Sequence, residues 1–536
     1  MLALTFLATA LLAVGAAASL YQKSSDNPTA VIDNGAVVGT KTSLPDSKTP
    51  INKFLGIPFG APPIRFSPPK PAESWSTPYD ATEFKPSCIQ KFNCPEASLI
   101  RTIKNFNTPP PPAGEDEDCL NLDIWAPTDA APGSKPVLFW IHGGRFSHGS
   151  GSLPMNEGSK FAAFEDLVVV TINYRTNIFG FPESLDLPKG EQNLGFLYQR
   201  LALDWIQRNI GAFGGDSRQV TIMGDSSGAG SVGALLTSPP DPVPFRAAIL
   251  QSGDATATLK PSGSWANVTK ITGCDKDNFA DVLECLRDIP ATKLKEHVEK
   301  AMLDFKPLSD DGITLSNHPR ANRLGSEDDP SLMARVPILA GTTADEGRLP
   351  DLKGVDLEAA LRFFIPDVTR KQIELFKNLY PLGSTGINND YDQVATILTE
   401  AEAQCPARFT TDEYASVDVK TWRYIYNASF ANAEVFKGSG AFHGSEIATL
   451  FGTYPEKGAT EFQDELSREM QGAWASFIRD PGAGPGWESV PKIGVFGDGV
   501  RPDTAQGGEE PLRVVDPDVV DRRCKYFKKM WEDSNP

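Results

Sequence analysis

The chain has 536 residues, of which 40% are hydrophobic and 22% charged, a composition that favours a globular protein with a large core. Its formal net charge of −18 argues against nucleic acid and anionic membrane surfaces as partners. The seven cysteines form no C-x-x-C or Cys/His ligand pattern, so a zinc site is not expected.

The first segment of the chain is a continuous apolar run. The sequence "MLALTFLATALLAVGAAASLYQK" has no charged side chain before Lys23 and ends in small residues around Ala16–Ala18. This pattern is typical of a secretory signal peptide, and about 17 apolar residues are short for a membrane span of about 20. We therefore expect residues 1–18 to be a signal peptide and residues 19–536 to form one soluble, extracellular domain.

Short apolar runs recur along the chain with helical segments between them, at 135–142, 167–174, 219–224, 245–252 and 336–341. Between the second and third runs, Leu194, Leu197, Leu201 and Trp205 lie at helical spacing, which predicts a crossover helix. Such an alternation predicts the α/β class, with a large, mostly parallel sheet covered by helices on both faces. The segments near 260–335 and 350–420 read as helical insertions on this sheet. Near the end, Val520, Cys524, Phe527 and Trp531 predict one closing helix.

One apolar run breaks into a cluster of glycines and serines, "QVTIMGDSSGAG" at 219–230. Gly224-x-Ser226-x-Gly228 follows a predicted strand and precedes a segment that can be helical, the context of a nucleophile elbow. In so sharp a turn, side chains two before and two after the serine would collide, so glycine is needed there. The pentapeptide alone is weak, because a chain with 46 glycines can contain it by chance.

A nucleophilic serine needs a histidine base and a carboxylate to orient it. The chain has five histidines, and the two that precede Ser226 are excluded because the acid and then the base follow the serine in hydrolases of this type. His297 lies in a charged helical stretch, and His318 lies in a loop that follows no strand. His443 alone follows a strand-like segment, at 422–427.

The acid and the oxyanion donors have candidates at the ends of other predicted strands. Asp345 and Glu346 follow the strand within "VPILAGTTADEG", and spacing alone cannot choose between them. The Gly-rich loop His142–Arg145 and the amide of Ser227 offer backbone N–H groups for a developing oxyanion.

Four motifs carry a resemblance that covers nearly the whole mature chain. They are "FGGDSRQVTIMGDSSG" (213–228), "EDCLNLDIWAP" (117–127), "FLGIPFGAPP" (54–63) and "LQSG" (250–253). Together they resemble the cholinesterase-type (type-B) carboxylesterase and lipase family of α/β-hydrolases. The resemblance implies that fold and an ester hydrolase without a cofactor.

Carried over to this chain, the resemblance implies Ser226 as nucleophile, Glu346 as acid and His443 as base. It implies the backbone N–H groups of Gly144, Arg145 and Ser227 as oxyanion donors. It also implies three disulfides, Cys88–Cys119, Cys274–Cys285 and Cys405–Cys524, and leaves Cys94 as a free thiol without catalytic duty.

The chain departs from the family pattern near the expected site. Asp225 stands where glutamate is usual, Ser227 where alanine is common, and Arg145 where glycine or alanine is usual. We expect the Arg145 amide still to donate and its side chain to be turned away from the substrate rather than to recognise an anionic group. The loop between Cys88 and Cys119 is Pro-rich and acidic and has no tryptophan, which disfavours choline binding and makes interfacial lipase activity less expected than general esterase activity.

The sequence therefore predicts a secreted serine carboxylesterase that acts on small-molecule or lipid esters. Three alternatives remain: a lipase or sterol esterase, an ester hydrolase or acyl transferase of a secondary-metabolite pathway, and a non-enzymatic adhesion protein. The last is disfavoured because all three triad residues are present. Asn267 and Asn427 begin N-x-[ST] sequons, and Asn267 is the better glycosylation candidate because Asn427 ends a predicted strand.

Overall fold

The computed structural model describes residues 27–92, 100, 102, 113–255, 261–365, 368–502 and 510–535. The predicted signal peptide at 1–18 and Cys94 lie outside the described residues, as do residues 107–112 of the Pro-rich stretch. All the predicted strands and the crossover helix fall within the described part of the chain.

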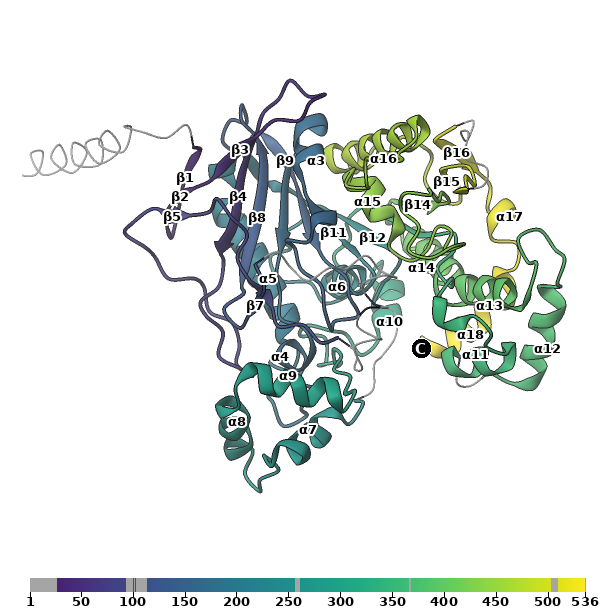
Figure 1. Ribbon diagram of the computed structural model, residues 1–536, viewed down its shortest axis with the longest axis horizontal. Helices are drawn as coiled ribbons and strands as arrows, with labels where there is room; N and C mark the ends of the chain where they lie inside the picture. Colours follow the sequence, from purple (N-terminus) through teal and green to yellow (C-terminus); the bar gives the residue numbers. More distant parts are fainter. Residues whose placement is uncertain are drawn as a thin grey trace, which may run out of the picture.

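An eleven-stranded sheet forms the centre of the molecule (Figure 1). Its spatial order is β16 (Leu512–Val515), β15 (Ile493–Phe496), β14 (Thr421–Tyr426), β13 (Ile338–Thr343), β12 (Ala247–Gln251), β11 (Gly215–Asp225), β9 (Lys135–Ile141), β10 (Val168–Ile172), β8 (Asn121–Pro127), β4 (Ile51–Pro58) and β3 (Thr40–Thr42). The strands from β15 through β10 are parallel to their neighbours, whereas the outer pairs are antiparallel. The predicted, mostly parallel sheet is confirmed.

Side chains that alternate along the strands pack against helices on opposite faces of the sheet. Val137, Phe139 and Ile141 of β9 pack on the side that carries α5 (Leu194–Asn209) and α6 (Ser227–Thr237). Leu138 and Trp140 point to the other side, toward α3 (Ser159–Glu165), α15 (Ser445–Phe451) and α16 (Glu461–Arg479). Because both faces are covered, the central strands carry apolar side chains on both sides, which is the pattern of the apolar runs in the sequence.

Two groups of helices extend beyond the sheet and have their own apolar clusters. The first contains α7 (Ser264–Thr272), α8 (Phe279–Asp288) and α9 (Ala291–Lys300), at the bottom of Figure 1. The second contains α11 (Leu357–Phe364), α12 (Arg370–Leu379), α13 (Asp390–Thr399), the π-helix Glu400–Gln404 and α14 (Cys405–Ser416), at the right. The helical insertions expected from the sequence are therefore present.

The remaining elements are short. They are β1 (Thr29–Ile32), β2 (Gly35–Val38), β5 (Tyr79–Asp80), β6 (Ser87–Cys88), β7 (Glu115–Asp116), α4 (Asn177–Gly180), α10 (Pro319–Gly325), α17 (Pro517–Val520), α18 (Lys528–Ser534) and the 3₁₀ turns Pro154–Asn156, Ile210–Phe213, Pro330–Leu332, Pro350–Leu352 and Cys524–Tyr526.

One helix prediction needs correction. The chain end is not one helix, because α17, a 3₁₀ turn and α18 are separated at Asp521, whose buried carboxylate pairs with Arg423 instead of continuing a helical face. The predicted crossover helix is confirmed as α5, in which Leu197 and Leu201 are half-buried and Tyr198 and Leu203 are fully buried. The helix is therefore covered on a broader arc than a single leucine stripe.

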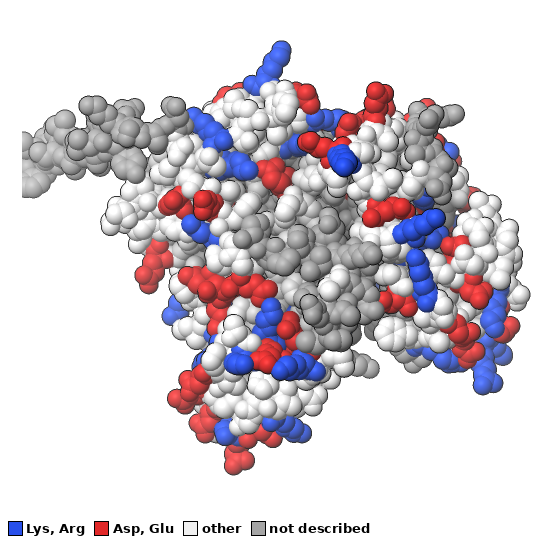
Figure 2. All heavy atoms as spheres, in the orientation of Figure 1, with Lys and Arg blue, Asp and Glu red and all other residues white. Residues whose placement is uncertain are grey.

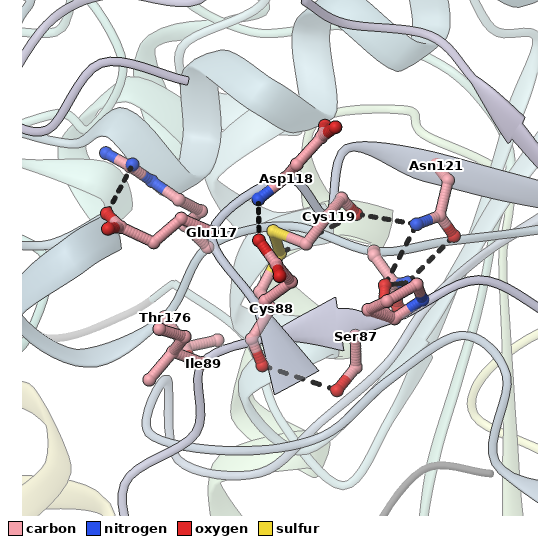
Figure 3. Close-up of a disulfide and its surroundings, with 12 residues drawn as sticks. Ser87, Cys88, Ile89, Glu117, Asp118, Cys119, Asn121 and Thr176 are labelled. Atoms are coloured by element: carbon pink, nitrogen blue, oxygen red, sulfur yellow. Dashed lines mark hydrogen bonds and ion pairs between the residues drawn. A yellow bond between two sulfur atoms is a disulfide. The ribbon is translucent and has the colours of Figure 1, made fainter. Parts of the chain in front are cut away.

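Three disulfides connect Cys88 to Cys119, Cys274 to Cys285 and Cys405 to Cys524, the pairs that the resemblance implies. Figure 3 shows the first of them beside Asn121, whose side-chain amide donates to the Cys119 carbonyl at 3.1 Å. Next to it, the Glu117 carboxylate accepts from Arg65, with 2.6 Å between Oε2 and Nη2. This disulfide and its polar neighbours fix both ends of the segment between β6 and β8.

No helix in the described part of the chain combines the length and the apolar character needed to cross a membrane. On the face drawn in Figure 2, the described Lys and Arg side chains are scattered among Asp and Glu and form no continuous basic surface.

Candidate active site

Ser226 lies between β11 and α6 with an unusual backbone conformation. Its φ of 55° and ψ of −121° place it in a region that residues with a side chain rarely adopt, at a cost of about 1–3 kcal/mol. Its amide donates to the Gln251 carbonyl of the neighbouring strand β12 at 2.8 Å, and its carbonyl accepts from the Gly230 amide at 2.9 Å. Hydrogen bonds to a strand and a helix hold the strained turn in place.

The glycines around Ser226 are required by close backbone contacts. A Cβ added to Gly224 would lie 2.4 Å from the carbonyl carbon of Gly228, and one added to Gly228 would lie 2.1 Å from the Ile141 carbonyl oxygen. A Cβ on Gly253 would lie 2.5 Å from the carbonyl oxygen of Ser226. The sharp strand-to-helix turn predicted for a nucleophile elbow therefore has the crowding that makes glycine necessary.

Glu346 and His443 are in direct contact, although they are far apart in sequence. Glu346 follows β13 and His443 lies between β14 and α15, and 2.5 Å separates Glu346 Oε2 from His443 Nδ1. The other carboxylate oxygen, Oε1, accepts from the Ser252 hydroxyl at 2.6 Å and from the Thr343 amide at 2.8 Å. A carboxylate held at both oxygens can fix the tautomer and orientation of an imidazole.

The electrostatics of this pair favour an ionised acid beside the imidazole. Burial disfavours the charge of Glu346, which is 7% exposed, but the charge and hydrogen bond of His443 and the bonds from Ser252 and Thr343 lower the pKa of Glu346. Burial opposes the charged form of His443, but Glu346, followed by the nearby Asp225, raises the pKa of His443. The side chain of His443 is 25% exposed.

Asp345, the other candidate acid, has different partners. Its Oδ1 accepts from Arg348 at 3.0 Å and its Oδ2 from Arg501 at 2.9 Å. Oδ2 also accepts from the Ala441 amide at 2.8 Å, and the Asp345 amide donates to the Ala441 carbonyl at 3.0 Å. Asp345 therefore joins the turn that carries Glu346 to the loop that carries His443, and Glu346 alone contacts the histidine.

The Gly-rich loop after β9 lies directly against the serine. A Cβ on Gly143 would lie 3.1 Å from Ser226 Cβ. Gly144 and Arg145 have positive φ values of 117° and 59°. Within the described chain, no hydrogen bond uses the amides of Gly144, Arg145 or Ser227 as donors. Amides that are free and close to a serine are suited to bind an oxyanion.

Ser227, where the family commonly has alanine, connects this loop to α6. Its hydroxyl oxygen accepts from the Phe146 amide at 3.2 Å, and its carbonyl accepts from the Ser231 hydroxyl at 3.0 Å. The Ser227 hydroxyl therefore binds the amide of Phe146, the residue after Arg145. This hydrogen bond links the Gly-rich loop to the start of α6.

Two further carboxyl groups are buried near His443. Asp225 is buried with Oδ1 unpartnered, and burial, followed by the charge of Glu346, raises its pKa to about 7 although His443 opposes the shift. Burial, followed by Asp225 and Glu346, also raises the pKa of Glu446, whose Oε1 accepts from Gln251 at 3.3 Å. Both carboxyls are therefore biased toward their neutral forms, and Glu346 remains the ionised partner of the histidine.

Sequence reasoning missed Ser252 and Glu446. Ser252 directly follows β12 and has a positive φ of 54°, and its hydroxyl binds Glu346 Oε1. The available signal was its position in "LQSG", immediately after a buried strand, where the other site residues also lie. Glu446 falls three residues after His443, on the first turn of α15, and the charged residue in an otherwise apolar helix was the only hint.

The four histidines that sequence reasoning set aside lie on other segments than His443. His297 lies on α9 and His318 at the start of α10, whereas His142 and His148 are buried in the Gly-rich loop. Among the described residues, no group of three or more His, Cys, Asp or Glu side chains is arranged to hold a metal ion.

A profile of the carboxylesterase family matches residues 26–483. The chain belongs to the carboxylesterase family. Among its relatives are the acetylcholinesterase of Bungarus fasciatus, 31% identical over 82% of this chain and 76% of that protein, and the pyrethroid hydrolase Ces2a of Mus musculus, 31% identical over 88% of this chain and 86% of that protein. A fumonisin B1 esterase of Sphingopyxis macrogoltabida is 31% identical over 90% of this chain and 88% of its own.

Membership of the carboxylesterase family identifies the fold as that of an α/β-hydrolase and the protein as a serine-dependent carboxylic ester hydrolase. Small-molecule esters are its substrate class. The similarity to cholinesterases shows that the chain belongs to the same family. It does not identify the ester that this protein hydrolyses.

Proposed function

We propose that the protein is a secreted carboxylesterase in which Ser226, His443 and Glu346 form the catalytic triad. The observation that supports it most strongly is the 2.5 Å contact between Glu346 Oε2 and His443 Nδ1, at the same edge of the sheet as the Ser226 turn. Strands β11, β12, β13 and β14 are parallel neighbours, so their C-terminal ends bring these three loops together.

In the proposed reaction, the Ser226 hydroxyl attacks the ester carbonyl while His443 Nε2 accepts its proton. The amides of Gly144, Arg145 and Ser227 bind the oxyanion, where each donor contributes about 10²–10³-fold to kcat. The histidine then gives the proton to the leaving alcohol and activates a water that releases the acyl group. Glu346 keeps Nδ1 protonated and stabilises the imidazolium in both steps.

Secretion and glycosylation are part of the proposal. The apolar run at 1–18 and the three disulfides support an oxidising, extracellular location. Asn267 is exposed on α7, which supports it as a glycosylation site, whereas Asn427 is half-buried and its side-chain oxygen accepts from Arg501 at 2.8 Å. We propose residues 19–536 as the mature enzyme, with Cys94 as a free thiol.

The triad is tested by replacing its members one at a time and measuring hydrolysis of 4-nitrophenyl butyrate. Ser226→Ala is expected to lower kcat by about 10⁶-fold and to abolish labelling by a fluorophosphonate. Glu346→Gln is expected to lower kcat by about 10²–10⁴-fold, because the imidazole loses its orienting charge. Full turnover by the Ser226→Ala protein would refute the mechanism.

Asp345→Asn is the matched control for the acid. Asp345 contacts arginines and the Ala441 amide but not the histidine, so its loss is expected to cost less than about tenfold in kcat. A larger loss in Asp345→Asn than in Glu346→Gln would assign the acid to Asp345. A series of acyl-chain lengths, with and without a lipid interface, separates a general esterase from a lipase.

A further inference from the structure

Arg145 is an arginine without an ion pair in the loop that lies against the nucleophile. Its side chain is exposed, and neither a hydrogen bond nor a salt bridge of its guanidinium occurs among the described residues. Two residues before it, Gly143 approaches Ser226, and the Arg145 amide is one of the free donors of the loop. A long cationic side chain therefore starts within a few ångströms of the place where the ester carbonyl binds.

The neighbours of Arg145 are basic. Lys91 Nζ and Lys306 Nζ each lie 3.4 Å from an oxygen of the same carboxylate, that of Asp304. Burial opposes ionisation of Asp304, but the charges of Lys91, Lys306 and then Arg145 lower its pKa, so the charge of Arg145 also acts on the carboxylate that the two lysines contact. The Lys91 amide also donates to the Ser147 carbonyl at 2.8 Å, which attaches this cluster to the Gly-rich loop.

The nearby histidine adds no positive charge to this cluster. Burial, followed by the charges of Arg145, His142 and Lys91, lowers the pKa of His148 to about 3, so its imidazole is neutral at pH 7. Three cations therefore lie near Asp304, while the carboxylates of Glu183 and Glu299 accept from the nearby Lys306 and Phe92 amides. On a protein with a net charge of −18, this is a local concentration of positive charge near the Gly-rich loop.

Nothing in the fold explains an arginine at this position. Its φ of 59° is left-handed, where a side chain costs roughly 1 kcal/mol relative to glycine. No described contact of the guanidinium offsets this cost. A strained residue with an exposed charge, in the loop that lies against the proposed nucleophile, is a candidate for binding a charged group of the substrate.

We propose that Arg145 binds a carboxylate carried by the substrate, so that the enzyme prefers esters with an anionic group near the scissile bond. The inference rests on the proposed function, and it reverses the expectation from the sequence that this side chain is turned away. Arginine suits the task because its planar guanidinium forms two parallel hydrogen bonds to a carboxylate. Lys91 and Lys306 reduce the repulsion that such an anion meets from the acidic surface.

The test compares matched anionic and neutral esters on the same enzyme preparation. On the acyl side, the 4-nitrophenyl monoester of adipic acid is compared with 4-nitrophenyl hexanoate. On the alcohol side, 4-(hexanoyloxy)benzoate is compared with its methyl ester. The readout is the anionic-to-neutral ratio of kcat/KM, which is independent of the folded fraction because both values come from one preparation.

Arg145→Gln is expected to lower this ratio by about tenfold to a hundredfold on at least one side, the range for loss of a charge-assisted hydrogen bond. The side that responds shows whether the carboxylate belongs to the acyl group or to the alcohol. Arg145→Lys is expected to fall between wild type and Arg145→Gln, because it keeps the charge and loses the planar fork.

Lys371→Gln, an exposed charge change on α12, is the control for net charge and is expected to leave the ratio within about twofold. An Arg145→Gln ratio within about twofold of wild type on both sides would overturn the inference, even if both rates fell. Failure of the proposed function is seen separately, as turnover retained by Ser226→Ala.

Discussion

The residue immediately before Ser226, the proposed nucleophile, has a buried acidic side chain with one unpartnered oxygen. Asp225 is buried, its Oδ1 lacks a partner, and its Oδ2 lies 3.3 Å from the place where a Cβ on Gly143 would be. Because its pKa is raised to about 7, this carboxyl changes charge in the range where an esterase works. When Asp225 ionises, its negative charge lies near His443 and stabilises the protonated imidazole.

Asp225→Asn removes that charge while keeping the shape of the side chain. Asp225 is one of the groups that raise the pKa of His443, so its loss lowers that pKa. Since the base must be neutral, the acid limb of the kcat/KM profile is expected to shift to lower pH. A pH profile on a neutral ester measures this, and a shift to higher pH would contradict it.

The same substitution affects stability with a defined sign. A carboxyl whose pKa is raised in the folded state stabilises the fold fully below its unfolded pKa, and this contribution is lost as pH rises through about 7. Because asparagine does not ionise, Asp225→Asn does not lose stability in this way as pH rises. The melting temperature of the variant, relative to wild type, should therefore be higher at pH 8 than at pH 4.

At the scale of elements, the backbone at the junction of β11 and α6 is packed so closely that a side chain would collide with it. A Cβ on Gly224 would meet the carbonyl carbon of Gly228 at 2.4 Å and its oxygen at 2.5 Å, and neither can move without breaking the turn. Gly230 lies on the same helix, yet a Cβ there would meet only Phe146 Cζ, at 3.6 Å.

Gly224→Ala and Gly230→Ala therefore form a matched pair. The first is expected to destabilise the protein by about 3 kcal/mol or more and to abolish esterase activity. The second is expected to stabilise it by about 0.5–1 kcal/mol, the helix preference of alanine over glycine. Denaturant unfolding measures both, and equal effects of the two changes would show that the turn is not crowded as described.

The elements that sequence reasoning predicted share a strong local signal. Strands β9, β10, β11 and β13 are buried apolar runs, and a run of this kind is recognisable without its partners. The broken chain end was not predictable, because the break depends on Asp521 meeting Arg423, 98 positions away in the sequence.

The same division holds for the candidate site. Ser226 and the Gly-rich loop stand in motifs of a few residues, so the sequence alone was enough to predict them. Asp345 and Glu346 are adjacent, and only the turn after β13 decides which carboxylate faces His443. Ser252 was missed because its role depends on Glu346, which follows a different strand. Contacts between strand ends are set by sheet order, and sheet order is not visible in a local pattern.

At the scale of the whole molecule, the longest disulfide loop connects the second helical insertion to the chain end. Cys405 begins α14 and Cys524 lies between α17 and α18, at a sequence separation of 119, whereas Cys274 and Cys285 are 11 apart. Closing the longer loop removes more freedom from the unfolded chain, by the loop-entropy estimate about 5 kcal/mol against about 3 kcal/mol.

Replacing Cys405 and Cys524 together by alanine is therefore expected to lower the melting temperature more than replacing Cys274 and Cys285. Thermal unfolding of the two double variants, monitored by the activity that remains after heating, checks which variant has the lower melting temperature. A larger loss from the short loop would mean that strain or local packing, and not loop closure, determines how these bonds stabilise the protein.

The paired hydrogen bonds between Asp345 and Ala441 have a consequence for motion. They join the turn of the acid to the loop of the base, and Arg501 holds the same carboxylate. Glu346 and His443 therefore lie on two loops that are joined to each other as well as in direct contact. Any motion that separates the proposed acid from the proposed base must first break these bonds, so displacement of one loop is expected to carry the other with it.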